Sequence, residues 1–142
     1  MVILLGLLVL PGCGCRLPEE HKVAPPPRDA PPEEVVRTYF AAIAGRDKET
    51  ARALLVHEAR DDELEFEAPD SPFQNWVSVT DLQIEGPEKD QFCAPGDTCV
   101  KVYVSFDLLQ CEPVTRPDGP WSEPFGLRLV DGRWLIIGHG QG

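Results

Sequence analysis

The feature that most constrains the fold is an alternation of apolar and polar side chains in the second half of the chain. Every second residue from 100 to 108 is apolar, namely Val100, Val102, Val104, Phe106 and Leu108. The residues between them are mainly polar, from Lys101 to Asp107. This period of two predicts a β-strand with one face on a core and the other face in water.

Three further segments predict antiparallel partners for this strand. Residues 125–130 repeat the alternation, and Asp131 and Gly132 form a two-residue hairpin turn into residues 133–139. Residues 76–85 also alternate, but the phase slips near Asp81, which predicts a β-bulge. On this assignment the inward-facing residues of the two best-patterned strands contain no titratable group: Val100, Val102, Val104, Phe106, Leu108, Phe125, Leu127 and Leu129.

Two helices are expected before the strands. Pro32 can open the first helix and Gly45 can end it, with Val36, Tyr39, Phe40 and Ile43 on one face. Asp47 can cap a second helix over about residues 48–60. These two segments predict a helical hairpin.

An acidic stretch between residues 58 and 70 raises the question of calcium. An EF-hand-type loop needs a glycine for its sharp turn, and none occurs between Gly45 and Gly86. We therefore interpret this stretch as a solvated helix face or loop.

The order of two helices and four antiparallel strands, ending in Asp131, Gly132, Arg133, Trp134, Leu135 and Ile136, resembles the NTF2-like family. The segment from Pro32 to Phe40 is also similar to the first helix of many such domains. The resemblance implies an α+β fold, an NTF2-like cone in which two N-terminal helices pack on a curved four-stranded antiparallel sheet. This fold hosts unrelated functions, so the resemblance implies no particular activity.

The N-terminus carries an uncharged apolar run over residues 2–10. It is shorter than the roughly 20 residues of a membrane-spanning helix and fits the apolar region of a secretory signal peptide. The following Leu10, Pro11, Gly12 and Cys13 resemble the lipobox of bacterial lipoproteins. The resemblance implies cleavage after Gly12, acylation of Cys13, as by palmitate, and a membrane anchor with the domain on the extracytoplasmic side. The alternative is that residues 2–10 form a buried strand or helix of the domain.

Two details depart from this pattern. Proline is unusual at the second lipobox position, and no basic residue precedes the apolar run, which suggests a start upstream of Met1. With the lipobox accepted, the chain divides into a signal peptide (1–12), a lipidated cysteine with a proline-rich tether (13–32) and a folded domain (33–142). The segment from Arg16 to Pro32 is a semi-rigid tether that extends by about 3.1 Å per residue, roughly 50 Å if fully extended, and lifts the domain off the membrane. A proline-rich ligand for a partner module is the competing interpretation.

Four cysteines remain beyond Cys13, and extracytoplasmic thiols tend to pair. Cys93 and Cys99 flank a short turn and are the favoured disulfide. Cys111 cannot reach Cys99 across a continuous strand, so it is left over unless it reaches Cys15 or the strand is broken. Zinc is the rival interpretation, but no closely spaced cysteine pair occurs, so we expect no metal.

The net charge of −11 argues against nucleic acid as a partner. We assign no catalytic role to the three histidines, find no nucleophile or phosphate-binding motif, and expect neither an enzyme nor a cofactor. Two functional classes stay open. One is a non-catalytic accessory module that binds another envelope protein, which we favour. The other is a module for a small apolar ligand, whose cavity would be lined by Tyr39, Trp76, Trp121 and Trp134. We expect a monomer.

Overall fold

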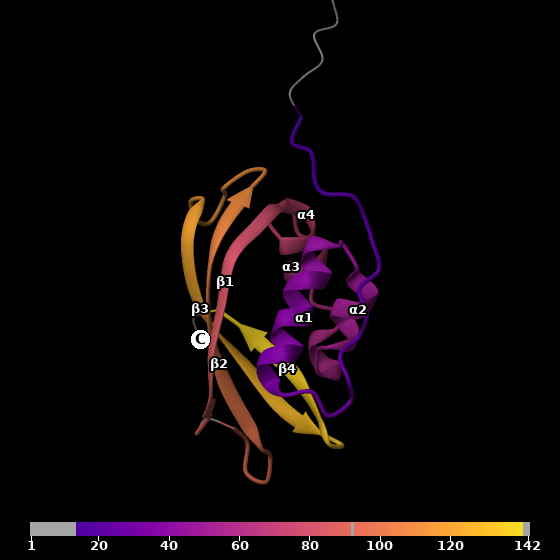
Figure 1. Cartoon of the computed structure of the whole chain (residues 1–142), viewed down its shortest axis with the longest axis vertical. Helices are drawn as coiled ribbons and strands as arrows, with labels where there is room; N and C mark the ends of the chain where they lie inside the picture. The colour runs from indigo at the N-terminus through magenta and orange to yellow at the C-terminus, as the bar shows by residue number, and fades with distance from the viewer. Residues whose placement is uncertain (1–13, 92, 141–142) are drawn as a thin grey trace, which may run out of the picture.

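The computed structural model describes residues 14–91 and 93–140, so the predicted leader and Cys13 lie outside the described residues. A helical layer covers one face of a four-stranded antiparallel sheet (Figure 1). The elements are, in chain order, α1 (Pro32–Ala44), α2 (Lys48–Ala53), the 3-10 turn η1 (His57–Ala59), α3 (Glu63–Phe66), α4 (Pro72–Asn75), β1 (Trp76–Lys89), β2 (Cys99–Gln110), β3 (Gly119–Val130) and β4 (Arg133–His139). Consecutive strands are neighbours in the sheet.

The four strand segments expected from the alternation are present. In β2 the even-numbered residues Val102 to Leu108 are buried, while Val100 is only partly buried. The bulge expected near Asp81 is also present, because the β1–β2 register shifts between Thr80 and Gln83 and Asp81 has a φ of 54°. Leu129 was expected to face inward, but it lies near the β3–β4 turn and is 39% exposed.

The interior is filled by aromatic side chains from α1 and the sheet. The ring centroid of Phe40 lies 5.1 Å from that of Phe106 and 5.5 Å from that of Phe125. Phe66 stacks on Phe73 at 5.1 Å, which connects α3 to α4. Burial of each such ring contributes about 1.5–3 kcal/mol, so these contacts hold the helical layer on the sheet.

The fold-class prediction of an NTF2-like cone with two N-terminal helices is wrong. Among the helices of residues 14–91 and 93–140, only α1, with 13 residues, is long. The second helix was expected to run to about residue 60, but α2 ends at Ala53. The reason is a competing backbone pairing: Ile136 donates to the carbonyl of Leu54, and Val56 donates to the carbonyl of Ile136. The chain after α2 therefore runs as an extended segment along β4 instead of continuing the helix.

The proline-rich segment is not a free tether in the described residues 14–31. It runs along the helical layer (Figure 1), and the backbone N–H of His21 donates to the carbonyl of Gly45 at 2.8 Å. A Cβ on Gly45 would lie 2.7 Å from the backbone oxygen of His21, so the helix-ending glycine also permits this close approach. Further along, the N–H of Val23 donates to Asp47 at 2.9 Å. The segment is part of the fold.

Candidate functional site

The structure does not bring the four predicted cavity residues into one cavity. Tyr39 and Trp76 are buried core residues, and Trp76 packs against Phe40 and Phe106. Trp121 lies under the guanidinium of Arg116. Trp134 faces the proline-rich segment, beside Pro25, Pro26 and Pro27. An aromatic-lined cavity inside the sheet is therefore absent from the described part of the chain.

The side chains with the most unusual environment form a buried charged cluster at the end of β4. Nε2 of His139 lies 2.8 Å from Oε2 of Glu65 on α3, and its Nδ1 lies 3.1 Å from Oε1 of Glu123 on β3. The side chain of Glu123 is only 1% exposed. One imidazole thus lies between two carboxylates that come from different layers of the fold.

Two further groups complete this cluster. The hydroxyl of Tyr39 donates to Oε1 of Glu65, so each oxygen of Glu65 has a partner. Nη1 of Arg116 lies 3.8 Å from Oε2 of Glu123. With His139 protonated, the two positive and two negative side chains balance one another, which is the condition for burying charge at tolerable cost.

The electrostatics of the cluster keep His139 charged. Burial alone would lower the pKa of His139, but the carboxylates of Glu123 and Glu65 outweigh it and raise the pKa to about 10. Burial would raise the pKa of Glu65, yet the hydrogen bonds from His139 and Tyr39 hold it below its usual value. Burial and the charge of Glu65 raise the pKa of Tyr39 well above its usual value. At neutral pH the cluster is therefore an imidazolium between two carboxylates.

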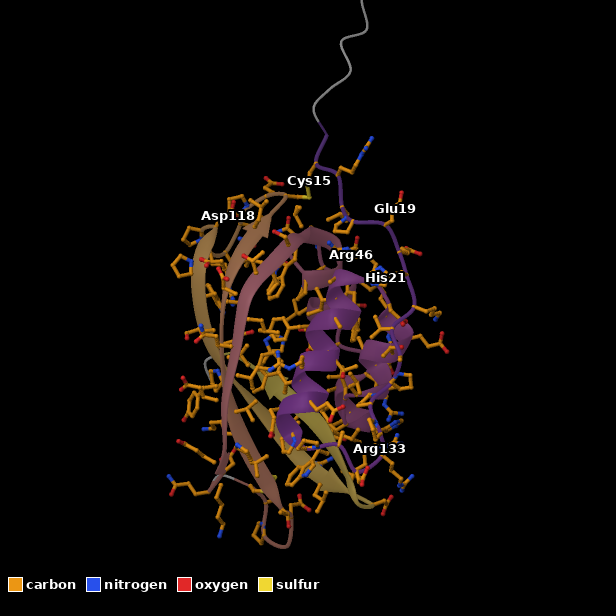
Figure 2. All side chains as sticks on the ribbon, viewed as in Figure 1. Cys15, Glu19, His21, Arg46, Asp118 and Arg133 are labelled. Carbon is orange, nitrogen blue, oxygen red and sulfur yellow. A yellow bond between two sulfur atoms is a disulfide. The ribbon has the colours of Figure 1, made fainter. Side chains whose placement is uncertain are left out.

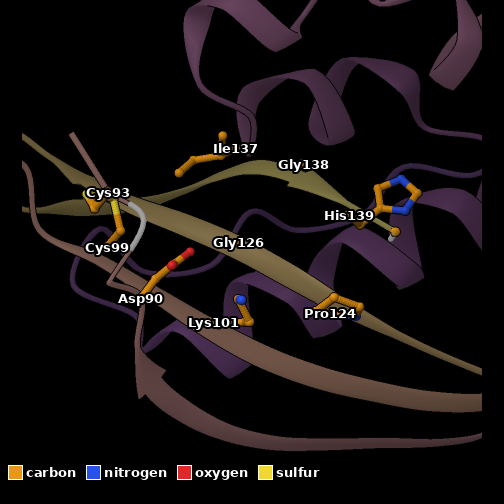
Figure 3. A pocket seen from close by; sticks show the side chains of 10 residues that line it. Asp90, Cys93, Cys99, Lys101, Pro124, Gly126, Ile137, Gly138 and His139 are labelled. Carbon is orange, nitrogen blue, oxygen red and sulfur yellow. A yellow bond between two sulfur atoms is a disulfide. The ribbon is translucent and has the colours of Figure 1, made fainter. Parts of the chain in front are cut away.

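His139 borders two surface hollows. One, of about 260 Å³, lies between α3 and β4, with apolar walls from Leu55, Leu64 and Ile137 and a floor of Tyr39, Glu65 and His139. The other is wider, about 910 Å³, and lies over the glycines of β3 and β4 (Figure 3). Its rim carries Asp90, Lys101 and the disulfide between Cys93 and Cys99.

The protonation state of His139 does not suit it to act as a general base at neutral pH. A general base must be able to take up a proton near the working pH, and His139 already carries it at neutral pH. The two ring nitrogens point at different carboxylates instead of converging with them on one point. Over residues 14–91 and 93–140, no group of three or more His, Cys, Asp or Glu side chains has an arrangement suited to a metal ion.

Sequence reasoning missed this cluster for identifiable reasons. Glu123 lies two residues before Phe125 and shares its inward face, but the predicted strand began only at Phe125, whereas β3 begins at Gly119. His139 faces inward only because β4 bulges: Ile136 pairs with Leu127, whereas Gly138 pairs with Gly126. Glu65 was assigned to a solvated acidic stretch, but its side chain is largely buried, with 14% of it exposed.

All four cysteines of the described residues are paired. Cys93 and Cys99 lie 5.7 Å apart at their Cα atoms, the pairing favoured from the sequence. Cys15 and Cys111 lie 5.3 Å apart and form the second disulfide, which settles the alternative left open for Cys111. This second bond joins the first described residues to the end of β2.

Comparison with known proteins gives limited information. No protein-family model matches the chain, and no curated protein matches it. A similar solved structure is the solution structure of a SEC-C motif containing protein from Rhodopseudomonas palustris, with a TM-score of 0.57, 19% identity and 80% of each chain covered. At this identity the likeness concerns the fold alone, and it is not the NTF2-like relation expected from the order of elements.

No helix within residues 14–91 and 93–140 has the length and apolar character required to cross a bilayer.

Proposed function

We propose that the chain is a lipid-anchored extracytoplasmic domain that acts as a non-catalytic interaction module of the cell envelope. The observation that carries the proposal is the disulfide between Cys15 and Cys111, two residues after the lipobox cysteine. Disulfides persist in oxidising compartments outside the cytosol, and a second bond joins Cys93 to Cys99. An apolar leader followed by Cys13 supplies the export signal and the anchor.

The non-catalytic part of the proposal is supported by the interior and by the cluster. The space between helices and sheet is occupied by the protein's own rings, including Phe40, Phe106 and Phe125. His139 is held as a cation by Glu65 and Glu123, which leaves it unsuited to act as a general base at neutral pH.

A second candidate function is the binding of a small apolar ligand in the 260 Å³ hollow beside His139. Leu64 is 75% exposed at its rim and Ile137 is 38% exposed, so two large apolar side chains face solvent around a concave surface. Pockets that bind small molecules start at about this size. Native mass spectrometry of the purified protein tests this candidate: a bound mass that is lost in Leu64→Asp would favour it over the interaction module.

The anchor is tested by replacing Cys13 with Ser in the full chain and fractionating cells. We expect the wild-type protein in the membrane fraction, with its mass reporting cleavage after Gly12 and an added lipid, and the variant released from the membrane. The Cys93→Ser/Cys99→Ser variant is the control, because it leaves the lipobox intact and should stay membrane-bound. Membrane retention of the Cys13→Ser variant would contradict the proposal.

A further inference from the structure

The disulfide at Cys15 limits how far the domain can lie from its anchor. Two peptide units separate Cys13 from Cys15, so their Cα atoms are at most about 7.6 Å apart. The Cα atom of Cys111 lies 5.3 Å from that of Cys15. The anchored residue is therefore within about 13 Å of the end of β2, whatever conformation the intervening residues adopt.

We propose that the end of the domain formed by the β2–β3 loop, residues 111–118, rests on the bilayer surface. The inference builds on the proposed lipidation of Cys13 and replaces the extended, semi-rigid tether expected from the sequence by a direct attachment at Cys15. Cys15 and Asp118 lie at the same end of the molecule (Figure 2). The partner that this end of the domain contacts is the lipid bilayer.

The surface of the loop suits a lipid headgroup region. Val114 in this loop is 62% exposed. In the proposed orientation its apolar side chain faces the bilayer surface. The loop carries two acidic residues, Glu112 and Asp118, and one basic residue, Arg116. Arg16 follows the bonded Cys15 directly and brings this end close to neutrality, in a chain whose net charge is −11.

The opposite end of the sheet has a different character. The β1–β2 connection lies there (Figure 1). The connection and the adjoining ends of β1 and β2 carry Glu85, Glu88, Asp90 and Asp97 against Lys89 and Lys101. The length of β2 separates it from the β2–β3 loop by roughly 36 Å, at about 3.3 Å per residue. Acidic side chains are repelled by anionic headgroups within a Debye length of about 10 Å, so the charge distribution favours the same orientation as the disulfide.

The test uses the lipidated full chain in vesicles of phosphatidylcholine and phosphatidylglycerol with a small fraction of gadolinium-chelate lipid. The paramagnetic relaxation of backbone amides is compared between Val114 in the loop and Gly96 at the far end. Because this effect falls with the sixth power of distance, we expect the relaxation at Val114 to exceed that at Gly96 by at least tenfold. Equal relaxation at the two sites, or faster relaxation at Gly96, would overturn the orientation.

A disulfide-free variant, Cys15→Ser/Cys111→Ser, is the matched control. In the described part of the N-terminal segment the first backbone hydrogen bond to the domain is at His21, so up to about eight residues, spanning up to roughly 27 Å, would separate the anchor from this bond. We expect this variant to stay on the vesicles and to lose most of the difference between Val114 and Gly96. An unchanged difference in the variant would contradict the role of the disulfide. An unmodified Cys13 and a chain free of the vesicles would overturn the anchor itself, which separates failure of the proposed function from failure of the orientation.

Discussion

Nε2 of His139, near the end of the last strand, lies 2.8 Å from Oε2 of Glu65, although 74 residues separate the two in the chain. The contact joins β4 to α3, a helix of only four residues whose other main attachment is the buried ring of Phe66. Because Nδ1 of the same ring faces Glu123 on β3, one side chain connects the helical layer to two strands.

Removal of the positive charge at His139 should lower the stability of the fold substantially. We expect His139→Gln to lower the free energy of unfolding by about 3 kcal/mol, because Glu65 and Glu123 would remain as buried carboxylates without their shared partner. Urea unfolding at pH 7 measures the change. Glu65→Gln should be less damaging in the His139→Gln background than in the wild type, since the two residues interact. Additive effects of the two substitutions on the free energy of unfolding would contradict an interaction between His139 and Glu65.

The stability should fall on the alkaline side of neutrality. The pKa of His139 is raised from 6.5 to about 10 in the folded chain, so its contribution is fully present below pH 6.5 and is lost as the pH rises to about 10. The pKa of Glu65 is lowered, so its contribution is present above pH 4.5 and is lost as the pH falls further. The midpoints of urea unfolding, measured between pH 4 and pH 10, report both the alkaline loss of stability and the acid loss.

The His139→Gln variant is the control for this profile. It lacks the group that titrates, so its midpoint should be nearly flat between pH 6.5 and pH 10. A wild-type profile parallel to that of the variant would show that His139 is not held as a cation.

The two disulfides should differ in their effect on stability. Cys15 and Cys111 are 96 residues apart, whereas Cys93 and Cys99 are six apart. On chain-entropy grounds the long loop contributes about 4.7 kcal/mol and the short loop about 2.4 kcal/mol. We therefore expect Cys15→Ser/Cys111→Ser to lower the free energy of unfolding more than Cys93→Ser/Cys99→Ser. The reverse order in urea unfolding would rule this out.

Asp47 should control how firmly the N-terminal segment is attached. Its carboxylate accepts from the N–H of Val23 and from the N–H and hydroxyl of Thr50, so it caps α2 and holds the segment at once. We expect Asp47→Ala to cost about 2 kcal/mol and to expose the bond after Lys22 to trypsin. Asp62→Ala is the matched control: it removes a cap, on α3, that does not touch the segment. Equal trypsin sensitivity of the two variants would refute this role.

The sequence predicted the sheet and α1 well because both depend on local signals. The alternation along β2 and the turn at Asp131 and Gly132 are sufficient to define those strands, and Gly45 does end α1. The end of α2 was mispredicted because Leu54 and Val56 pair with β4, a contact more than 80 residues away that no local pattern reveals. The NTF2-like assignment failed with it, since it required two long helices.

The candidate site was out of reach for a related reason. Each member of the cluster looks ordinary in its own segment: Glu65 is one of several acidic residues, and His139 lies between glycines. Only the bulge near Ile137 turns His139 inward, and a one-residue change of register reverses the face of every following side chain. The proline-rich segment was mispredicted as a tether because composition cannot report the contact at Asp47.

The bond between Cys15 and Cys111 also decides where mechanical load enters the molecule. Any pull on the chain before Cys15 passes through the disulfide to the end of β2, an interior strand held on both sides by β1 and β3. Residues 16–31 lie outside this path of force and carry no tension while the bond is intact. If the bond is reduced, the same force acts instead on the hydrogen bonds at His21 and Val23, which can break one after the other. The redox state of this cysteine pair therefore determines how the domain responds to force. With the bond intact the whole sheet bears the load, and with the bond reduced the N-terminal segment detaches one hydrogen bond at a time.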